Sequence, residues 1–372
     1  MSNRREFLQD LATTTAGILF TGCGLADSAG GFQQSAGDGR RREILIGGRR
    51  VRTIDLHCHC YVPEVWDLVK DYDQAKPLQA TLDSPEIKKM NVTNVTDRLR
   101  QMDEQGIDMQ AVAMATTHFY PWAERDLASQ IVKIQNEKIA ELCAAHPERF
   151  VGMGTVAMQH PDLAAEQMEN AVKKLDMRGI MINASVNGEE LSAAKFHLFW
   201  SKAEELGTLI FLHPRGFPEG DRRFQGNGNL SNVIANPLDT TVALSHLIFE
   251  GTLDRFPGLK ICAAHGGGYL ASYIGRSDHC AEIDQKDCRP LKKRPSEYLK
   301  QLYFDSLVFS AENLRHLVAE VGAGRIVLGT DFPYVMGDTD AVNHVLSTPG
   351  LSDAQRESIL GGTAARLLRI GV

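Results

Sequence analysis

From residue 51 to the C-terminus, strand-like segments alternate with helix-like segments, and no other feature limits the fold as strongly. Eight apolar strands are predicted, over residues 51–57, 109–115, 150–156, 179–183, 208–213, 259–265, 302–306 and 325–331. Helical periodicity separates several of them, over residues 123–146, 163–175, 193–206, 240–255 and 311–321. Alternating units of this kind build a parallel sheet covered by helices. Eight of them predict an α/β fold, the (β/α)8 TIM barrel.

Composition and charge narrow the class of partner. Of the 372 residues, 43% are apolar, which is ample for the core of such a barrel. The formal net charge is −7. Binding to phosphate backbones requires clustered Lys and Arg side chains. The charge therefore argues against nucleic acid as a partner.

The first 30 residues are typical of an export signal. Arg4 and Arg5 precede a weakly apolar stretch over residues 11–20, an order that resembles a twin-arginine signal. Residues 20–23 (FTGC) also approximate a lipoprotein processing box, in which Cys23 would carry a lipid anchor, and the sequence leaves lipidation open. We therefore expect the protein to be periplasmic or anchored to the membrane. Residues 31–50, rich in Gly, Ser, Gln and Arg, are expected to form a flexible linker.

A long connection follows the first predicted strand. Residues 60–95 form a segment longer than a barrel loop needs to be. Loops at this end of a barrel surround the active site. The sequence therefore predicts a lid-like insertion within a barrel domain that spans residues 51–372.

Residues able to bind a metal or to transfer a proton stand at the ends of four predicted strands. His57 and His59 end the first strand and project to the same face, because side chains alternate along a strand. His213 ends the fifth strand, His265 the sixth and Asp331 the eighth. The carboxyl ends of barrel strands share one mouth, so the five side chains are expected to converge there. Imidazoles with a carboxylate suit Zn²⁺, with Mn²⁺ or another divalent ion as the alternative.

The motifs around these residues resemble those of the amidohydrolase-related decarboxylase family (amidohydrolase family 2) of the metal-dependent hydrolase superfamily. The matching stretches are residues 213–214 (HP), 265–268 (HGGG), 329–333 (GTDFP), 136–150, 236–241 (NPLDTT) and 256–260 (FPGLK). The resemblance extends from residue 51 to the C-terminus and implies a TIM-barrel enzyme that uses a divalent metal. It is specific to the family, though not to a substrate.

The resemblance also implies roles for individual residues. It makes four residues the metal ligands, namely His57, His59, His213 and Asp331. It makes His265 an acid/base group beside the metal, and Asp331 a second candidate for proton transfer. Arg276 matches an arginine that binds the substrate carboxylate and comes from the neighbouring subunit, so a homodimer is expected. Arg98 matches a second carboxylate-binding arginine, a role that suits the planar guanidinium.

Two departures from the family pattern bear on the substrate. Asp284 stands where a third arginine would lie, and Arg215 replaces a tryptophan that is frequent after the His-Pro pair. Arg215, with Arg222 and Arg223, offers an alternative carboxylate contact. His118, which follows the second predicted strand, is expected to contact the substrate.

The implied function is a metal-dependent carboxy-lyase that removes carbon dioxide from a small aromatic or unsaturated carboxylic acid. Either a metal-activated water adds to the substrate with His265 as base, or the substrate chelates the metal and Asp331 or His265 protonates its carbon. The sequence does not choose between these mechanisms. The alternative function is a mononuclear hydrolase or lactonase of the same superfamily. A binuclear hydrolase is disfavoured, because residues 179–183 (GIMIN) of the fourth strand lack a lysine or glutamate to bridge two ions.

Overall fold

The computed structural model describes residues 41–283 and 291–371. The predicted export signal, Cys23 and residues 31–40 of the predicted linker lie outside the described residues, as does Asp284. In the described part of the chain, no helix is both long and apolar enough to cross a membrane.

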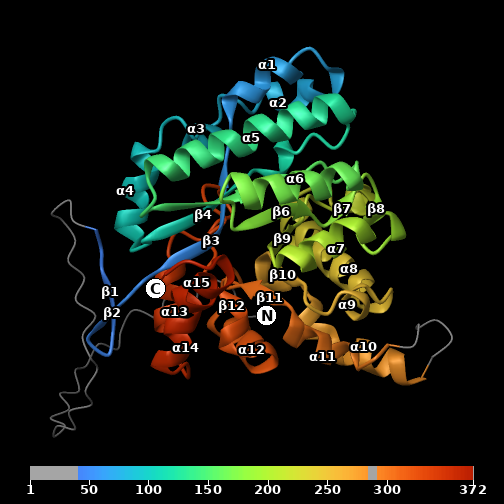
Figure 1. Cartoon of the computed structure of the whole chain (residues 1–372). Helices are drawn as coiled ribbons and strands as arrows, with labels where there is room; N and C mark the ends of the chain where they lie inside the picture. Colours follow the sequence, from blue (N-terminus) through green and yellow to red (C-terminus); the bar gives the residue numbers. More distant parts are fainter. Residues whose placement is uncertain (1–40, 284–290, 372) are drawn as a thin grey trace, which may run out of the picture. The chain divides into compact units, whose positions relative to one another are not determined.

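Parallel strands form a nearly closed barrel in the described part of the chain (Figure 1). The eight strands are β3 (Ile54–Cys60), β4 (Met109–Met114), β5 (Phe150–Gly154), β6 (Gly179–Asn183), β9 (Leu209–His213), β10 (Lys260–Ala263), β11 (Tyr303–Asp305) and β12 (Ile326–Val327). Each pairs with the next in this order. The segment after β12 returns to β3, where Leu56 N donates to Leu328 O at 2.9 Å and His59 N to Phe332 O at 2.8 Å. The predicted (β/α)8 barrel is thus confirmed.

Helices follow most strands and cover the outside of the barrel (Figure 1). They are α1 (Trp66–Val69), α2 (Lys76–Gln79), α3 (Pro85–Met90), α4 (Thr96–Gln105), α5 (Arg125–Ala145), α6 (Pro161–Lys174), α7 (His197–Leu206), α8 (Asn236–Phe249), α9 (Thr252–Arg255), α10 (Leu270–Ile283), α11 (Pro295–Tyr298), α12 (Ala311–Val321), α13 (Ala341–Ser347), α14 (Asp353–Glu357) and α15 (Thr363–Leu368). The helix predicted over residues 240–255 is in fact two, α8 and α9. Gly251 separates them in a left-handed conformation (φ 78°), which interrupts the helical hydrogen bonding.

The predicted flexible linker is wrong over its last residues. Strands β1 (Ile44–Ile46) and β2 (Arg49–Val51) pair as an antiparallel hairpin in which Ile44 and Ile46 are buried. Gly47 and Gly48 form the two-residue turn with positive φ angles of 55° and 75°, as tight hairpin turns require. The buried isoleucines therefore hold this hairpin against the barrel core, although its arginine-rich composition is typical of a linker.

The predicted insertion over residues 60–95 is an ordered layer of short helices. It contains α1, α2 and α3, and its buried side chains include Val62, Val69 and Met90. Tyr61 N donates to Met90 O at 2.9 Å and Val92 N donates to Tyr61 O at 3.1 Å, which fixes both ends of the insertion beside β3. Its action as a lid stays a prediction.

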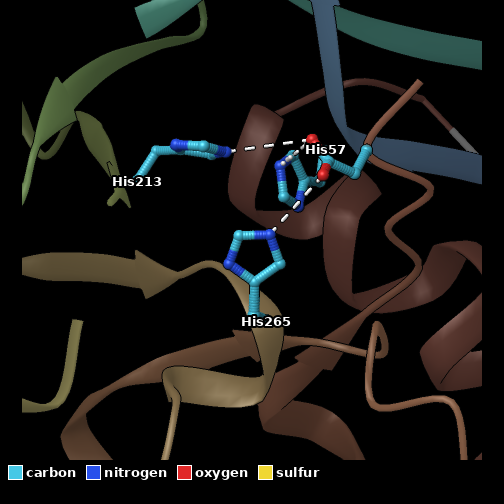
Figure 2. A group of neighbouring side chains, drawn as sticks. His57, His213 and His265 are labelled. Carbon is cyan, nitrogen blue, oxygen red and sulfur yellow. Dashed lines mark ion pairs between the residues drawn. The ribbon is translucent and has the colours of Figure 1, made fainter. Parts of the chain in front are cut away.

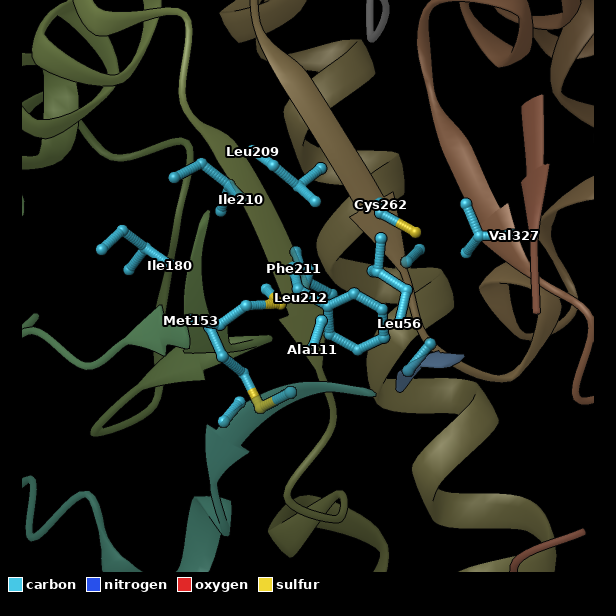
Figure 3. Packing of buried hydrophobic residues seen from close by; sticks show 14 of the residues in the cluster. Leu56, Ala111, Met153, Ile180, Leu209, Ile210, Phe211, Leu212, Cys262 and Val327 are labelled. Carbon is cyan, nitrogen blue, oxygen red and sulfur yellow. The ribbon is translucent and has the colours of Figure 1, made fainter. Parts of the chain in front are cut away.

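The barrel core consists of side chains from neighbouring strands (Figure 3). Every residue of β3, β4, β5, β6 and β9 is buried, as expected for parallel strands covered on both faces. Phe211 of β9 packs against the imidazole of His57, with 5.0 Å between ring centroids. The apolar core thus continues directly beneath the first predicted metal ligand.

Candidate active site

Four potential ligand groups converge at the carboxyl ends of the strands. His57 lies on β3, His213 ends β9, and His265 and Asp331 follow β10 and β12. One donor atom from each of these four residues lies within 4.8 Å of the other three. Figure 2 shows the three imidazoles pointing toward one another from different strands. Residues separated by more than 270 positions in the sequence therefore form one cluster.

The carboxylate of Asp331 is at the centre of this cluster. Its Oδ1 atom lies 3.1 Å from Nε2 of His57 and 3.8 Å from Nε2 of His213, and its Oδ2 atom lies 3.6 Å from Nε2 of His265 (Figure 2). His59, the fifth predicted residue, also reaches it, with Nε2 2.9 Å from Oδ1. The group of four mutually close donors includes His265 but not His59. The division of these two histidines between metal ligand and acid/base group stays a prediction.

Hydrogen bonds orient two of the imidazoles for metal binding. Nδ1 of His57 lies 2.7 Å from Asp305 Oδ2, and Nδ1 of His213 lies 2.6 Å from the Pro214 carbonyl oxygen. In each ring, Nδ1–H then donates outward and directs Nε2 toward the cluster as the atom that would bind an ion. Both Nε2 atoms are buried and have no hydrogen-bond partner. Buried lone pairs beside a carboxylate are what a divalent ion requires, so the residues fit a metal.

The electrostatics of the cluster favour a cation. Burial lowers the pKa of His57, but the carboxylates of Asp331 and Asp305 outweigh it and raise that pKa to about 10, so the ring holds a proton on Nε2 that a bound cation would displace. Burial lowers the pKa of His213 to about 3, so that imidazole is neutral and available as a ligand. Burial also raises the pKa of Asp331, yet the surrounding histidines bring it well below its ordinary value. The carboxylate is therefore ionised and attracts positive charge.

The backbone is constrained at both predicted proton-transfer residues. His265 and Asp331 have positive φ angles of 56° and 57°, an uncommon conformation for residues other than glycine. Gly268, three residues after His265, has φ 65° and ψ −129°, and a Cβ atom there would lie 2.1 Å from the Pro237 carbonyl oxygen. The turn after β10 thus needs a glycine at this position to bring His265 to the cluster.

Asp305 belongs to the site although the sequence analysis did not name it. Its Oδ2 accepts from His57 Nδ1 and from the backbone N–H of His265 at 2.9 Å, and its Oδ1 accepts from the N–H of Gly266 at 2.8 Å and of Leu307 at 3.1 Å. One buried carboxylate therefore positions both His57 and the turn that carries His265. The sequence contains one indication of this role, because Asp305 stands near the end of the seventh predicted strand, where site residues are expected.

Arg98 holds the end of the strand that carries His59. It is buried, with 1% of its surface exposed, and donates to Gln110 Oε1 at 2.7 Å and to the His59 carbonyl at 2.8 Å. Its guanidinium also lies over the Phe332 ring, 4.8 Å from the centroid. These contacts tie the end of β3 to β4, so the side chain supports the strand that carries His59. Its second terminal nitrogen, Nη2, is buried without a hydrogen-bond partner, and the predicted contact with a substrate carboxylate stays a prediction.

The other two predicted substrate contacts differ in position. His118 is buried, and its Nε2 atom has no hydrogen-bond partner. Its ring packs against Tyr61 with 4.8 Å between centroids. Arg276 is exposed on α10, and no hydrogen bond or ion pair joins it to the metal cluster within the described residues. Whether either residue contacts a substrate stays a prediction.

Comparison with known proteins identifies similar chains along nearly the whole barrel. A family model described as amidohydrolase matches residues 54–370. The chain is 28% identical over 330 residues to 2-amino-3-carboxymuconate-6-semialdehyde decarboxylase from Dictyostelium discoideum, covering 85% of this chain and 91% of that protein. The structure of 5-carboxyvanillate decarboxylase from Sphingomonas paucimobilis matches with a TM-score of 0.79 at 26% identity, covering 86% of this chain and all (100%) of that one. A dihydroxybenzoic acid decarboxylase from Polaromonas, with bound manganese and the inhibitor 2-nitroresorcinol, matches with a TM-score of 0.74 at 27% identity, covering 86% and 97%.

Proposed function

Because this chain belongs to the amidohydrolase family, we propose that it is a metal-dependent decarboxylase that removes carbon dioxide from a small aromatic or unsaturated carboxylic acid. The observation that carries the proposal is the convergence of His57, His213, His265 and Asp331 within 4.8 Å at one mouth of the barrel. The three compared proteins are named as decarboxylases. Measurement of carbon dioxide release from candidate acids tests the proposal.

The chain's own residues supply binding and proton transfer. His57, His59, His213 and Asp331 are the proposed ligands, and the bound ion would act as a Lewis acid toward an oxygen of the substrate or of water. When the bond between the substrate carbon and its carboxylate breaks, the electron pair stays on carbon and a proton must replace carbon dioxide. His265 lies beside Asp331 and is the proposed donor of that proton, with Asp331 as its partner in the transfer.

For the metal we propose zinc, with manganese as the alternative. Neutral imidazoles and one carboxylate form a donor set that zinc prefers. The decarboxylase from Polaromonas holds manganese, which makes that ion the direct competitor. Elemental analysis of the purified protein, followed by reloading of the chelated protein with each ion, distinguishes them.

We propose a homodimer in which Arg276 reaches the active site of the second copy. Arg276 is exposed on α10, and Tyr273 and Ile283 of the same helix are 68% and 69% exposed. Large apolar side chains on one exposed helix suit an interface between copies. Sedimentation of the wild type and of Tyr273→Glu tests this arrangement, because a charge in the interface is expected to produce monomers.

For localisation we propose export by the twin-arginine route, to the periplasm or to a membrane through a lipid on Cys23. The support is Arg4 and Arg5 followed by the apolar stretch. Replacement of both arginines by lysine is expected to retain the protein in the cytoplasm, and Cys23→Ser is expected to release any membrane-bound fraction. Unchanged fractionation of the double lysine variant would refute the export route.

A further inference from the structure

A cavity with polar and apolar walls lies at the carboxyl ends of the strands, next to those that carry the metal cluster. Its volume is about 330 Å³, and its lining includes Asn183, Arg215, Phe119, Val156 and Met158. Asn183 ends β6 and is the register partner of His213, while Arg215 follows His213 by two residues. The cavity therefore adjoins a proposed metal ligand through two neighbouring strands.

Arg215 brings an unpaired positive charge to this cavity. Its backbone N–H donates to Asp239 Oδ2 at 3.0 Å, which fixes the turn after β9. Within the described residues, no salt bridge or side-chain hydrogen bond joins its guanidinium to a carboxylate. The Arg215 side chain is exposed and lines the cavity, so its charge is accessible to a ligand there.

Two buried polar groups nearby also lack partners. Asn183 is 8% exposed, and its Oδ1 atom has no hydrogen-bond partner. His118 is 1% exposed, and its Nε2 atom has none. Thr117 Oγ1 lies 2.9 Å from His118 Nδ1, so a hydroxyl that donates there leaves Nε2–H as a free donor. Buried polar atoms of this kind cost free energy unless a ligand satisfies them.

We propose that Arg215 binds a second carboxylate of the substrate, distant from the carboxylate that is removed, and so selects dicarboxylic acids with an aromatic or unsaturated body. The apolar walls formed by Phe119, Val156 and Met158 suit a flat body, and the guanidinium suits a carboxylate because it donates two parallel hydrogen bonds. Asn183 in the lining supplies a further polar contact. The inference rests on the proposed carboxylic-acid substrate and adds the number of acid groups that it carries.

Binding of two unreactive acids that differ by one carboxylate tests the inference. Isophthalate and benzoate are titrated calorimetrically into the manganese-loaded protein. The wild type is expected to bind isophthalate roughly tenfold more tightly than benzoate. Arg215→Gln is expected to abolish this preference by weakening isophthalate alone, and Arg215→Lys to retain part of it. Arg315→Gln, at an exposed arginine of α12 that pairs with Glu312 and does not line the cavity, is the matched control and is expected to leave both affinities unchanged.

The opposing results are equally specific. A wild type that binds both acids equally, or neither, would overturn the subsite, as would an Arg215→Gln variant that changes both affinities by the same factor. Replacing the Arg215 side chain keeps the hydrogen bond from its backbone N–H to Asp239, so each variant is expected to fold. Thermal unfolding verifies this. Failure of carbon dioxide release would refute the decarboxylase without altering the binding result, so the two proposals fail separately.

Discussion

Nδ1 of His57 lies 2.7 Å from Oδ2 of Asp305, and both side chains are fully buried. Asp305 accepts from His57 on one oxygen and from two backbone N–H groups on the other. The carboxylate therefore determines which nitrogen of His57 faces the metal cluster, as partners of metal-binding histidines commonly do.

Asp305→Asn is expected to weaken metal binding by about 10- to 100-fold. The amide nitrogen of asparagine must face either His57 and His265 N–H or the N–H groups of Gly266 and Leu307, so a donor meets a donor on one side. Competition with a chromophoric chelator measures the affinity. Asp254→Asn, at a carboxylate that accepts from Tyr298 away from the site, is the control. Equal affinities in wild type and Asp305→Asn would show that Asp305 does not orient the ligand.

His57→Ala and His265→Ala are expected to separate metal binding from proton transfer. His57→Ala should lose the metal, because it removes a ligand whose lone pair faces Asp331. His265→Ala should retain metal near the wild-type content and lose turnover by at least about 100-fold. Metal content by elemental analysis and turnover are measured on the same samples, with His197→Ala, a surface histidine that contacts Arg255, as the control. Metal loss in His265→Ala with retention in His59→Ala would show that His265 is the metal ligand and would leave His59 as the acid/base candidate.

Arg98→Ala is expected to lower the free energy of unfolding by about 2–4 kcal/mol. The replacement leaves the His59 carbonyl and the Gln110 amide oxygen buried without their charged donor. Arg100→Ala on the same helix is the matched control, because Arg100 is exposed and pairs only with surface carboxylates, so its effect should stay within about 0.5 kcal/mol. Urea denaturation measures both. An Arg98→Ala protein with unchanged stability but a raised KM would contradict the structural role and support the predicted contact with the substrate.

Asp239 is expected to make the protein less stable as the pH rises. Burial, the largest effect, raises its pKa from 3.8 to about 7, with Glu190 and Glu219 adding to the rise. Between pH 4 and 7 the folded state therefore holds a proton that the unfolded state has lost, so the free energy of unfolding falls as pH rises through this range, by an amount on the order of 4 kcal/mol. Asp239→Asn keeps an oxygen for the Arg215 N–H without ionising. Denaturation at several pH values should give a wild-type curve that declines relative to the variant, and parallel curves would contradict the assignment.

The strand pattern was sufficient to predict the barrel and the residues at its mouth. Strand β6 occupies the predicted residues 179–183, and His57, His213, His265 and Asp331 meet as expected. This succeeded because parallel strands of a barrel place their carboxyl ends together, so the position along a strand determines the position in space.

The remaining features depend on packing that the pattern does not encode. Arg98 has the sequence context of a surface helix residue, yet it is buried because the His59 carbonyl and the Phe332 ring lie within its reach. The arginines around β1 and β2 favour a linker by composition, although Gly47 and Gly48 are typical of a tight hairpin turn. The place of Asp305 near the end of the seventh predicted strand makes it a site candidate, but its role depends on its bond to the His57 ring, which only the structure shows.

Carbon dioxide release tests the central claim most directly. The protein is loaded with zinc or manganese and supplied with 2,6-dihydroxybenzoate, 5-carboxyvanillate and muconate-type acids, and with lactones and esters as hydrolase substrates. We expect carbon dioxide from at least one acid, equimolar with the acid consumed, and expect the release to be abolished by chelation and by His265→Ala. Hydrolysis of a lactone or ester with no carbon dioxide from any acid would contradict the decarboxylase and support the mononuclear hydrolase.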